Sequence, residues 1–137
     1  MTKHRIGAAL IGLAFMVSGS VRAHHSFAAG YDLSKKITLT GTLTKIDWRN
    51  PHIELSLEAK GDRGQVEAWV IEGMPPSWFR ARDVGKADFE KAFGHPVTVE
   101  AVRARDGSLA GLLQQITFPD GSSVRMPQLQ PAPDSRP

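Results

Sequence analysis

The sequence contains no cysteine. Disulfide bonds, thiolate nucleophiles and cysteine-ligated zinc or iron–sulfur sites are therefore excluded. Several short catalytic motifs are also missing, since the chain has no Gly-x-Ser-x-Gly, no His-Glu-x-x-His, no phosphate-binding loop and no dinucleotide fingerprint. These absences favour a binding or accessory protein over an enzyme.

The apolar run at the N-terminus is too short to cross a membrane. It extends from Ile6 to Val17 without a charge, whereas a transmembrane helix needs about 20 apolar residues. Basic residues precede the run, and Val21-Arg22-Ala23 supplies small residues at the −3 and −1 positions of a signal peptidase site. This order is typical of a secretory signal. We predict a signal peptide over residues 1–23 and a mature periplasmic protein that begins at His24.

Net charge is also absent once the predicted signal peptide is removed. The chain has 17 Lys and Arg and 14 Asp and Glu; Lys3, Arg5 and Arg22 leave with the signal, so 14 basic residues face 14 acidic ones. Binding of nucleic acid needs a basic face, and we therefore expect no nucleic-acid partner. The mature chain suits one domain, which we expect to be a monomer without a membrane span.

Alternating apolar and polar residues predict a β-protein. The alternation is clearest in Ile37–Ile46, where Gly41 predicts a bend or bulge. Further strands are predicted over His52–Ala59, Gln65–Glu72, Val97–Arg105, Leu112–Phe118 and Ser122–Met126. Both faces of Gln65–Glu72 are apolar, which indicates a central strand or one covered by the helical segment.

Two short helical segments are predicted between the third and fourth strands. Ser77 is the expected N-cap of the first, which ends near Arg82, and Asp88–Phe93 forms the second. This order favours a five- to six-stranded OB-like barrel, and a small β-sandwich is the alternative. We predict a mainly β domain over residues 24–126 and a disordered, proline-rich tail over residues 127–137.

Several segments resemble those of a known family of small exported bacterial proteins. They are His24-His-Ser-Phe-Ala-Ala-Gly-Tyr-Asp32, Ile37-Thr-Leu-Thr-Gly-Thr-Leu-Thr-Lys45, Trp48-Arg-Asn-Pro-His52, Val102-Arg-Ala-Arg-Asp-Gly107 and Ile116-Thr-Phe-Pro-Asp-Gly121. On these segments the chain resembles the DUF6152 family, from about His24 to Val124. The resemblance implies an exported protein with an OB-like fold, and it implies no particular activity.

The histidines are the strongest candidates for chemistry. After cleavage, His24 offers an α-amine and an imidazole on one residue, and the two nitrogens can chelate one copper ion. A third nitrogen from His25, His52 or His95 would complete a histidine brace, and copper(II) favours such nitrogen-rich tetragonal sites. The alternative is that the terminal histidines bind nothing and that His52 only bonds the nearby turn.

A second candidate site lies where the first strand turns into the next. Trp48, Arg49 and His52 place an aromatic ring, a cation and an imidazole at one barrel rim, where OB-like folds bind ligands. The alternative is that Trp48 plugs the end of the barrel, because large aromatic residues dominate small cores.

Three functions therefore compete. The first is an exported binding or accessory module that holds copper through His24 with His25 or His52. The second is a metal-free rim binder of a small polar ligand or a periplasmic partner protein. The third is a copper-dependent redox enzyme, which needs an open coordination position.

Overall fold

The long strand β1 changes its partner half-way along its length. The computed structural model describes residues 26–129, in which a one-turn helix α1 (Ser26–Ala29) leads into β1 (Tyr31–Asp47). The first part of β1 pairs antiparallel with β4 (Pro96–Ala104), and its last part pairs antiparallel with β2 (Glu54–Lys60). The predicted signal peptide and the tail from residue 130 onward lie outside the described residues.

Gly41 lies where β1 exchanges β4 for β2, because it pairs with residues of both strands. A Cβ atom at this position would collide with the backbone carbonyl of Glu58. The predicted irregularity is present nearby, since the β1–β2 register shifts between Leu43 and Lys45. The glycine thus permits the close approach of β2, and the bulge itself follows a few residues later.

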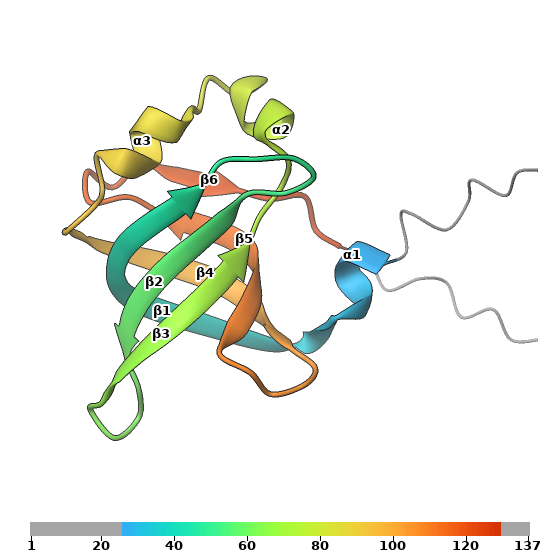
Figure 1. Ribbon diagram of the computed structural model, residues 1–137, viewed down its shortest axis with the longest axis vertical. Coiled ribbons are helices and arrows are strands. Elements are labelled where there is room, and N and C mark those ends of the chain that lie inside the picture. Colours follow the sequence, from blue (N-terminus) through green and yellow to red (C-terminus); the bar gives the residue numbers. More distant parts are fainter. Residues whose placement is uncertain (1–25, 130–137) are drawn as a thin grey trace, which may run out of the picture.

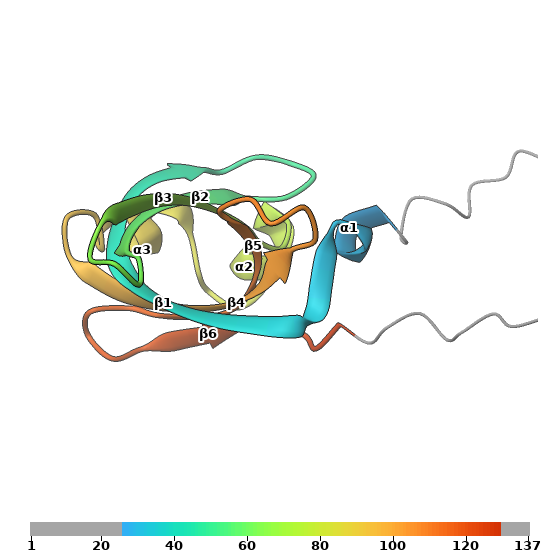
Figure 2. The ribbon, with the colours of Figure 1, turned by 90° about the horizontal axis from the view of Figure 1, so that it is seen from below.

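A parallel pairing closes the sheet into a barrel. The strand order is β3-β2-β1-β4-β5-β6, and β3 (Val66–Glu72) also pairs in parallel with β5 (Ala110–Thr117). Figure 2, seen from below, shows β1 to β5 curving around a common interior. The short strand β6 (Ser123–Arg125) pairs with the second half of β5. This topology confirms the predicted OB-like fold over the β-sandwich.

Two short helices between β3 and β4 cover one end of the barrel (Figure 1). They are α2 (Pro76–Arg80) and α3 (Lys86–Glu90), and each buries one phenylalanine. The rings of Phe79 and Phe89 are 5.5 Å apart and meet edge to face. The helical insert was predicted, but its cap was not: Pro75 is the N-cap of α2, and Ser77 makes no capping bond. Proline at the first helical position needs no amide partner.

The core consists of the inward-facing residues of the strands and the helix residues above them. Fully buried members include Leu43, Ile53, Leu55, Leu57, Ile71, Phe79, Phe89, Val97, Val99, Leu113 and Ile116. β3 is a central strand, as one of the two predicted alternatives had it, since it pairs with β2 on one edge and with β5 on the other. The other alternative, that the helical segment covers it, is wrong. Trp69 and Ile71 are buried, but the side chains of Val66 and Val70 are 69% and 42% exposed. The helices cover an end of the barrel and leave the outer face of β3 to solvent.

Candidate functional site

Four segments that are distant in the sequence enclose a cleft of about 490 Å³. They are the start of β1, the β1–β2 loop, the end of β3 and the β4–β5 loop. We call it the His52 cleft, and its lining residues are Gly30, Tyr31, Pro51, His52, Glu72, Ala104, Asp106, Ser108 and Ala110. In OB folds the β1–β2 and β4–β5 loops commonly carry the ligand-binding residues.

Three side chains form a hydrogen-bonded chain across the His52 cleft. Nδ1 of His52 lies 2.9 Å from Oε1 of Glu72, and the hydroxyl of Tyr31 donates a 2.6 Å hydrogen bond to Oε2 of the same carboxylate. Both carboxylate oxygens are therefore engaged, which fixes the orientation of Glu72. The fixed carboxylate in turn orients the imidazole ring of His52.

The β2–β3 ladder explains why His52 and Glu72 meet. The N–H of Ile53 donates to the carbonyl of Met74 at 3.2 Å, and the N–H of Gly73 donates to the carbonyl of Ile53 at 2.9 Å. These bonds extend the β2–β3 pairing one step beyond the end of each strand. Glu54 is the register partner of Glu72. His52 lies two residues before Glu54 and is therefore a diagonal neighbour of Glu72 across the two strands, within reach of the hydrogen bond between them.

The electrostatics of the cleft keep Tyr31 protonated. Burial raises the pKa of the Tyr31 hydroxyl well above its ordinary value, and the hydrogen bond to Glu72 and the negative charges of Glu72, Glu54 and Asp106 raise it further. A phenolate at this position would be desolvated and repelled by three carboxylates. Tyr31 thus acts as a hydrogen-bond donor rather than as an anionic ligand.

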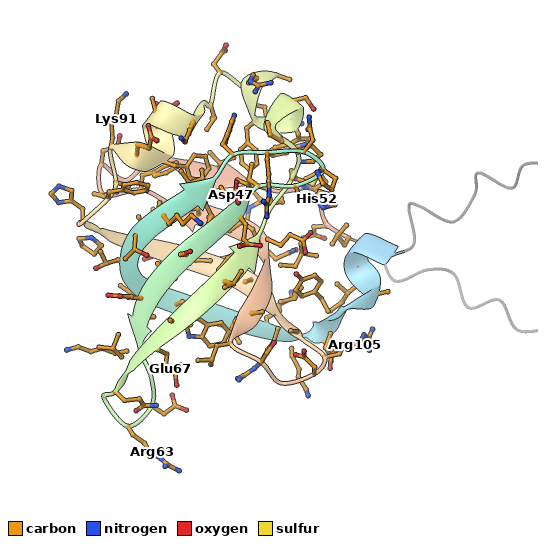
Figure 3. The ribbon with its side chains drawn as sticks, in the orientation of Figure 1. Asp47, His52, Arg63, Glu67, Lys91 and Arg105 are labelled. Carbon is orange, nitrogen blue, oxygen red and sulfur yellow. The ribbon has the colours of Figure 1, made fainter. Side chains whose placement is uncertain are left out.

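The chain segment that enters β1 is fastened to the rim of the cleft. Nε of Arg105 donates to the carbonyl of Ala29 at 3.0 Å, and the N–H of Arg105 donates to the carbonyl of Gly30 at 2.9 Å. Figure 3 shows Arg105 beside the junction of α1 and β1. The β4–β5 loop therefore holds the end of α1 next to the cleft.

The structure separates the residues of the predicted rim site. Trp48 is partly buried, and its ring centroid lies 5.7 Å from that of Phe79 and 5.8 Å from that of Phe89. Arg49 is exposed and pairs with Asp47, with an N–O distance of 3.2 Å. Only His52 of the predicted trio lines the cleft. Trp48 packs under the helices at the barrel end, as its alternative interpretation had it.

The predicted copper ligands are only partly within the described residues. His24 and His25 lie outside residues 26–129, and His52 lies in the cleft. His95 is exposed and lines a different cavity, beside α3. Within residues 26–129, no three His, Asp or Glu side chains are close enough together to hold a metal ion.

Sequence reasoning missed Tyr31, Glu72 and Asp106 as members of the site. The sequence provided a weak indication that Glu72 lies near His52. Glu72 is the last residue of one predicted strand, and His52 is the first residue of another, with which the first strand pairs. Tyr31 carried a signal only as the sole tyrosine of the chain. Asp106 follows the predicted strand Val97–Arg105, and nothing in the sequence connects this position with the β1–β2 loop.

Comparison with known proteins agrees with the family resemblance noted above. The profile of a family of unknown function, DUF6152, matches residues 13–115. The chain belongs to the DUF6152 family. No curated protein matches this DUF6152 chain significantly.

Two solved structures with similarity to the DUF6152 chain are crystal forms of the mitochondrial single-stranded DNA binding protein Rim1 from S. cerevisiae. Each is 18% identical, with a TM-score of 0.44 and coverage of 62% of this chain; the alignments cover 92% and 94% of the Rim1 chains. Within the described part of the chain, no helix has the length and hydropathy needed to cross a membrane.

Proposed function

We propose that this DUF6152 protein is an exported, periplasmic binding module whose ligand is held at the His52 cleft. The order of charged, apolar and small residues in positions 1–23 supports export and cleavage before His24. The balanced charge of the mature chain argues against nucleic acid as the partner. The proposal is one of binding rather than catalysis, because His52 is held by Glu72 and Tyr31 in a structural network, and the hydroxyl of Ser108 donates to Asp106 within its own turn rather than to His52.

The proposed ligand is copper(II), held by the α-amine and imidazole of His24 together with the ring of His52 or His25. The observation that carries this proposal is the pairing of His52 with Glu72, which Tyr31 reinforces. In carboxylate–histidine–metal arrangements, a carboxylate holds one ring nitrogen and the metal takes the other, so the ring is oriented before the metal arrives. Here Glu72 holds Nδ1, and Nε2 of His52 is the proposed metal ligand.

Chain connectivity supports the participation of the mature N-terminus. Only α1, with four residues, separates His25 from Gly30, which lines the cleft. Four helical residues advance about 6 Å. Arg105 fastens the end of α1 to the rim of the cleft, and this connectivity supports the proposal that residues preceding α1 supply ligands.

The charge of the cleft also suits a cation. Glu72 and Asp106 line it, and Glu54 lies close enough to act on Tyr31.

Metal binding requires the α-amine of His24 to lose its proton, and the ordinary pKa of an α-amine is about 7.7–8.0. Copper affinity is therefore expected to rise between pH 6 and pH 8, a range set by that value.

A metal-free function of the same cleft is the second candidate. The position of the cleft between the β1–β2 and β4–β5 loops favours it, since these loops carry ligands in OB folds. The ligand would then be a small polar molecule or a loop of a periplasmic partner protein that bonds to His52 and Asp106. A copper-dependent redox enzyme requires turnover in addition to binding and is tested only after copper binding is established.

Calorimetric titration with copper(II) and zinc(II) tests the proposal on protein purified from the periplasm, with its N-terminus verified by mass spectrometry. We expect one tight copper site per chain and weaker zinc binding. One glycine added before His24 should abolish tight binding, because it moves the α-amine away from the imidazole. His52→Gln should weaken binding if His52 is the third ligand, and Glu72→Gln should weaken it about 10- to 100-fold through the orientation of His52.

The control variant is Glu58→Gln, which removes one carboxylate from an exposed, outward position of β2 outside the lining of the His52 cleft. It should leave copper binding unchanged. Equal copper binding by the native protein and the glycine-extended form would refute a site built on the α-amine. A complete lack of copper binding would leave the metal-free ligand as the function to test.

A further inference from the structure

A second cavity lies between α3 and the turn that joins β5 to β6. Its volume is about 500 Å³, and it shares no lining residue with the His52 cleft. The floor is apolar and consists of Val84, Ala92, Phe118 and Val124. Figure 3 shows Lys91, from the end of α3, at the opposite side of the view from His52. Cavities of this size with an apolar floor and a few polar groups are typical binding sites.

Acidic side chains dominate the rim of this cavity. Asp83, Asp88 and Asp120 line it, whereas Lys91 is its only lysine or arginine. Nζ of Lys91 lies 3.3 Å from Oδ1 of Asp88, so its charge is already partly matched. His95 is the remaining titratable group of the lining. The rim therefore has an excess of negative charge, which favours a ligand that combines an apolar group with positive charge.

The strand β6, whose residues Ser123 and Val124 line the cavity, has backbone groups directed away from β5. The N–H of Phe118 donates to the carbonyl of Ser122, and the N–H of Met126 donates to the carbonyl of Gln114, both at 2.8 Å. Alternate residues of an antiparallel strand point their backbone groups to opposite edges. Ser123 and Arg125 therefore direct theirs to the other edge, where no strand of residues 26–129 pairs with β6.

We propose that this surface binds an extended segment of a partner protein in which an apolar residue has lysine or arginine two positions before and after it, on the same face of the strand. The segment adds to β6 as a further strand through the backbone groups of Ser123 and Arg125. Its apolar side chain enters the cavity over Phe118, and its basic residues approach the acidic rim. Strand addition obtains affinity from main-chain bonds and specificity from pockets that accept alternate side chains. Because β6 has only three residues, the association is weak and reversible.

The test uses NMR titration of the ¹⁵N-labelled mature protein with an acetylated, amidated seven-residue peptide. The peptide has a central phenylalanine, lysine two positions before and two positions after it, and valine at the other four positions. One control peptide replaces each lysine with glutamate, and a second carries N-methyl groups on the backbone amides that would face β6. We expect saturable shifts of the Ser123, Val124 and Arg125 amides with the first peptide and at least tenfold weaker binding of both controls.

Two protein variants examine the surface from the other side. Ser123→Pro removes an N–H that faces away from β5, a position where an edge strand tolerates proline, and it should weaken peptide binding at least fivefold; Ser123→Ala should not. Asp83 has a φ of 57°, a conformation that asparagine also accepts. Asp83→Asn should therefore keep the fold and weaken binding about threefold.

Three results would overturn the inference. They are the absence of saturable shifts at millimolar peptide, equal binding of the glutamate peptide, and equal binding of the N-methylated peptide. The last result does not depend on any variant folding correctly. Because the two sites share no residue, copper binding at the His52 cleft neither supports nor contradicts this surface.

Discussion

Tyr31 is the only tyrosine of the chain, so its ionisation can be followed directly. Its hydroxyl donates a 2.6 Å hydrogen bond to Glu72 in a half-buried position. Burial is the largest cause that raises its pKa above the ordinary value of 10.0, and Glu72 is the next. We therefore predict that Tyr31 ionises at a clearly higher pH in the native protein than in the unfolded chain, and that Glu72 contributes much of the difference.

The size of the Glu72 contribution follows from the hydrogen bond. A bond from a neutral donor to an ionised carboxylate contributes about 1.5–3 kcal/mol. Tyr31 is only half-buried, so the lower end of that range applies, and 1.4 kcal/mol is about tenfold in an ionisation constant. Glu72→Gln keeps an acceptor for the hydroxyl but removes the charge. The variant should therefore make Tyr31 easier to ionise by about tenfold, whereas Glu58→Gln should have little effect.

Absorbance at 295 nm against pH measures this ionisation, and circular dichroism on the same samples verifies that the protein is still folded. The raised pKa also predicts the direction of alkaline unfolding. The contribution of Tyr31 to stability is fully present below the unfolded pKa of about 10 and is lost as the pH rises through the folded value. A native titration curve that coincides with that of the urea-unfolded chain would refute the hydrogen-bonded chain as described.

The remaining predictions concern stability. Gly41→Ala should lower the free energy of unfolding by about 3 kcal/mol, because the added Cβ meets the backbone of β2. Gly30 has open space around it, so Gly30→Ala should change the free energy of unfolding by less than about 1 kcal/mol. The urea midpoints of the two variants should differ accordingly, and equal midpoints would contradict the close approach of β2 to Gly41. Phe89→Ala should cost about 3–5 kcal/mol, since Phe89 is fully buried among aromatic rings, and a change below about 1 kcal/mol would contradict this packing. The Asp88 carboxylate accepts a hydrogen bond from the N–H of Gly85, and this bond lowers the pKa of Asp88. The stabilisation is present above the pKa of the unfolded chain and is lost as the pH falls through the lowered pKa of the folded protein. The free energies of unfolding of the native protein and of Asp88→Ala should therefore differ by about 0.5–1 kcal/mol at pH 7 and converge near pH 2.

Strands with strict alternation were predictable because burial of one face determines which residues are apolar. In β2 and the residue before it, Ile53, Leu55 and Leu57 are buried and Glu54 and Glu58 are exposed, as their order predicts. The start of β1 was not predicted. Its pairing with β4 is irregular between Asp32 and Lys36, and a bulge disrupts the period on which the prediction depends.

The predicted rim site shows where local sequence stops being informative. Trp48, Arg49 and His52 are close in the chain, yet the turn between β1 and β2 sends Trp48 under the helices and His52 into the cleft. Which neighbour faces which side depends on residues far away, such as Phe79 and Phe89 for Trp48 and Glu72 for His52.

The amino-acid sequence by itself determined the strand pattern, the helical insert and the OB-like order of elements, because these follow from periodicity and from turn residues close in the chain. It also provided the expectation of export and of a copper-binding N-terminus, which stay predictions. Only the tertiary structure decided which residues meet. Tyr31, His52, Glu72 and Asp106 come from four different segments, and the closure of the barrel through the β3–β5 pairing brings their ends together. The pairing of distant strands depends on many contacts across the barrel, and a local sequence pattern does not predict which strands will pair.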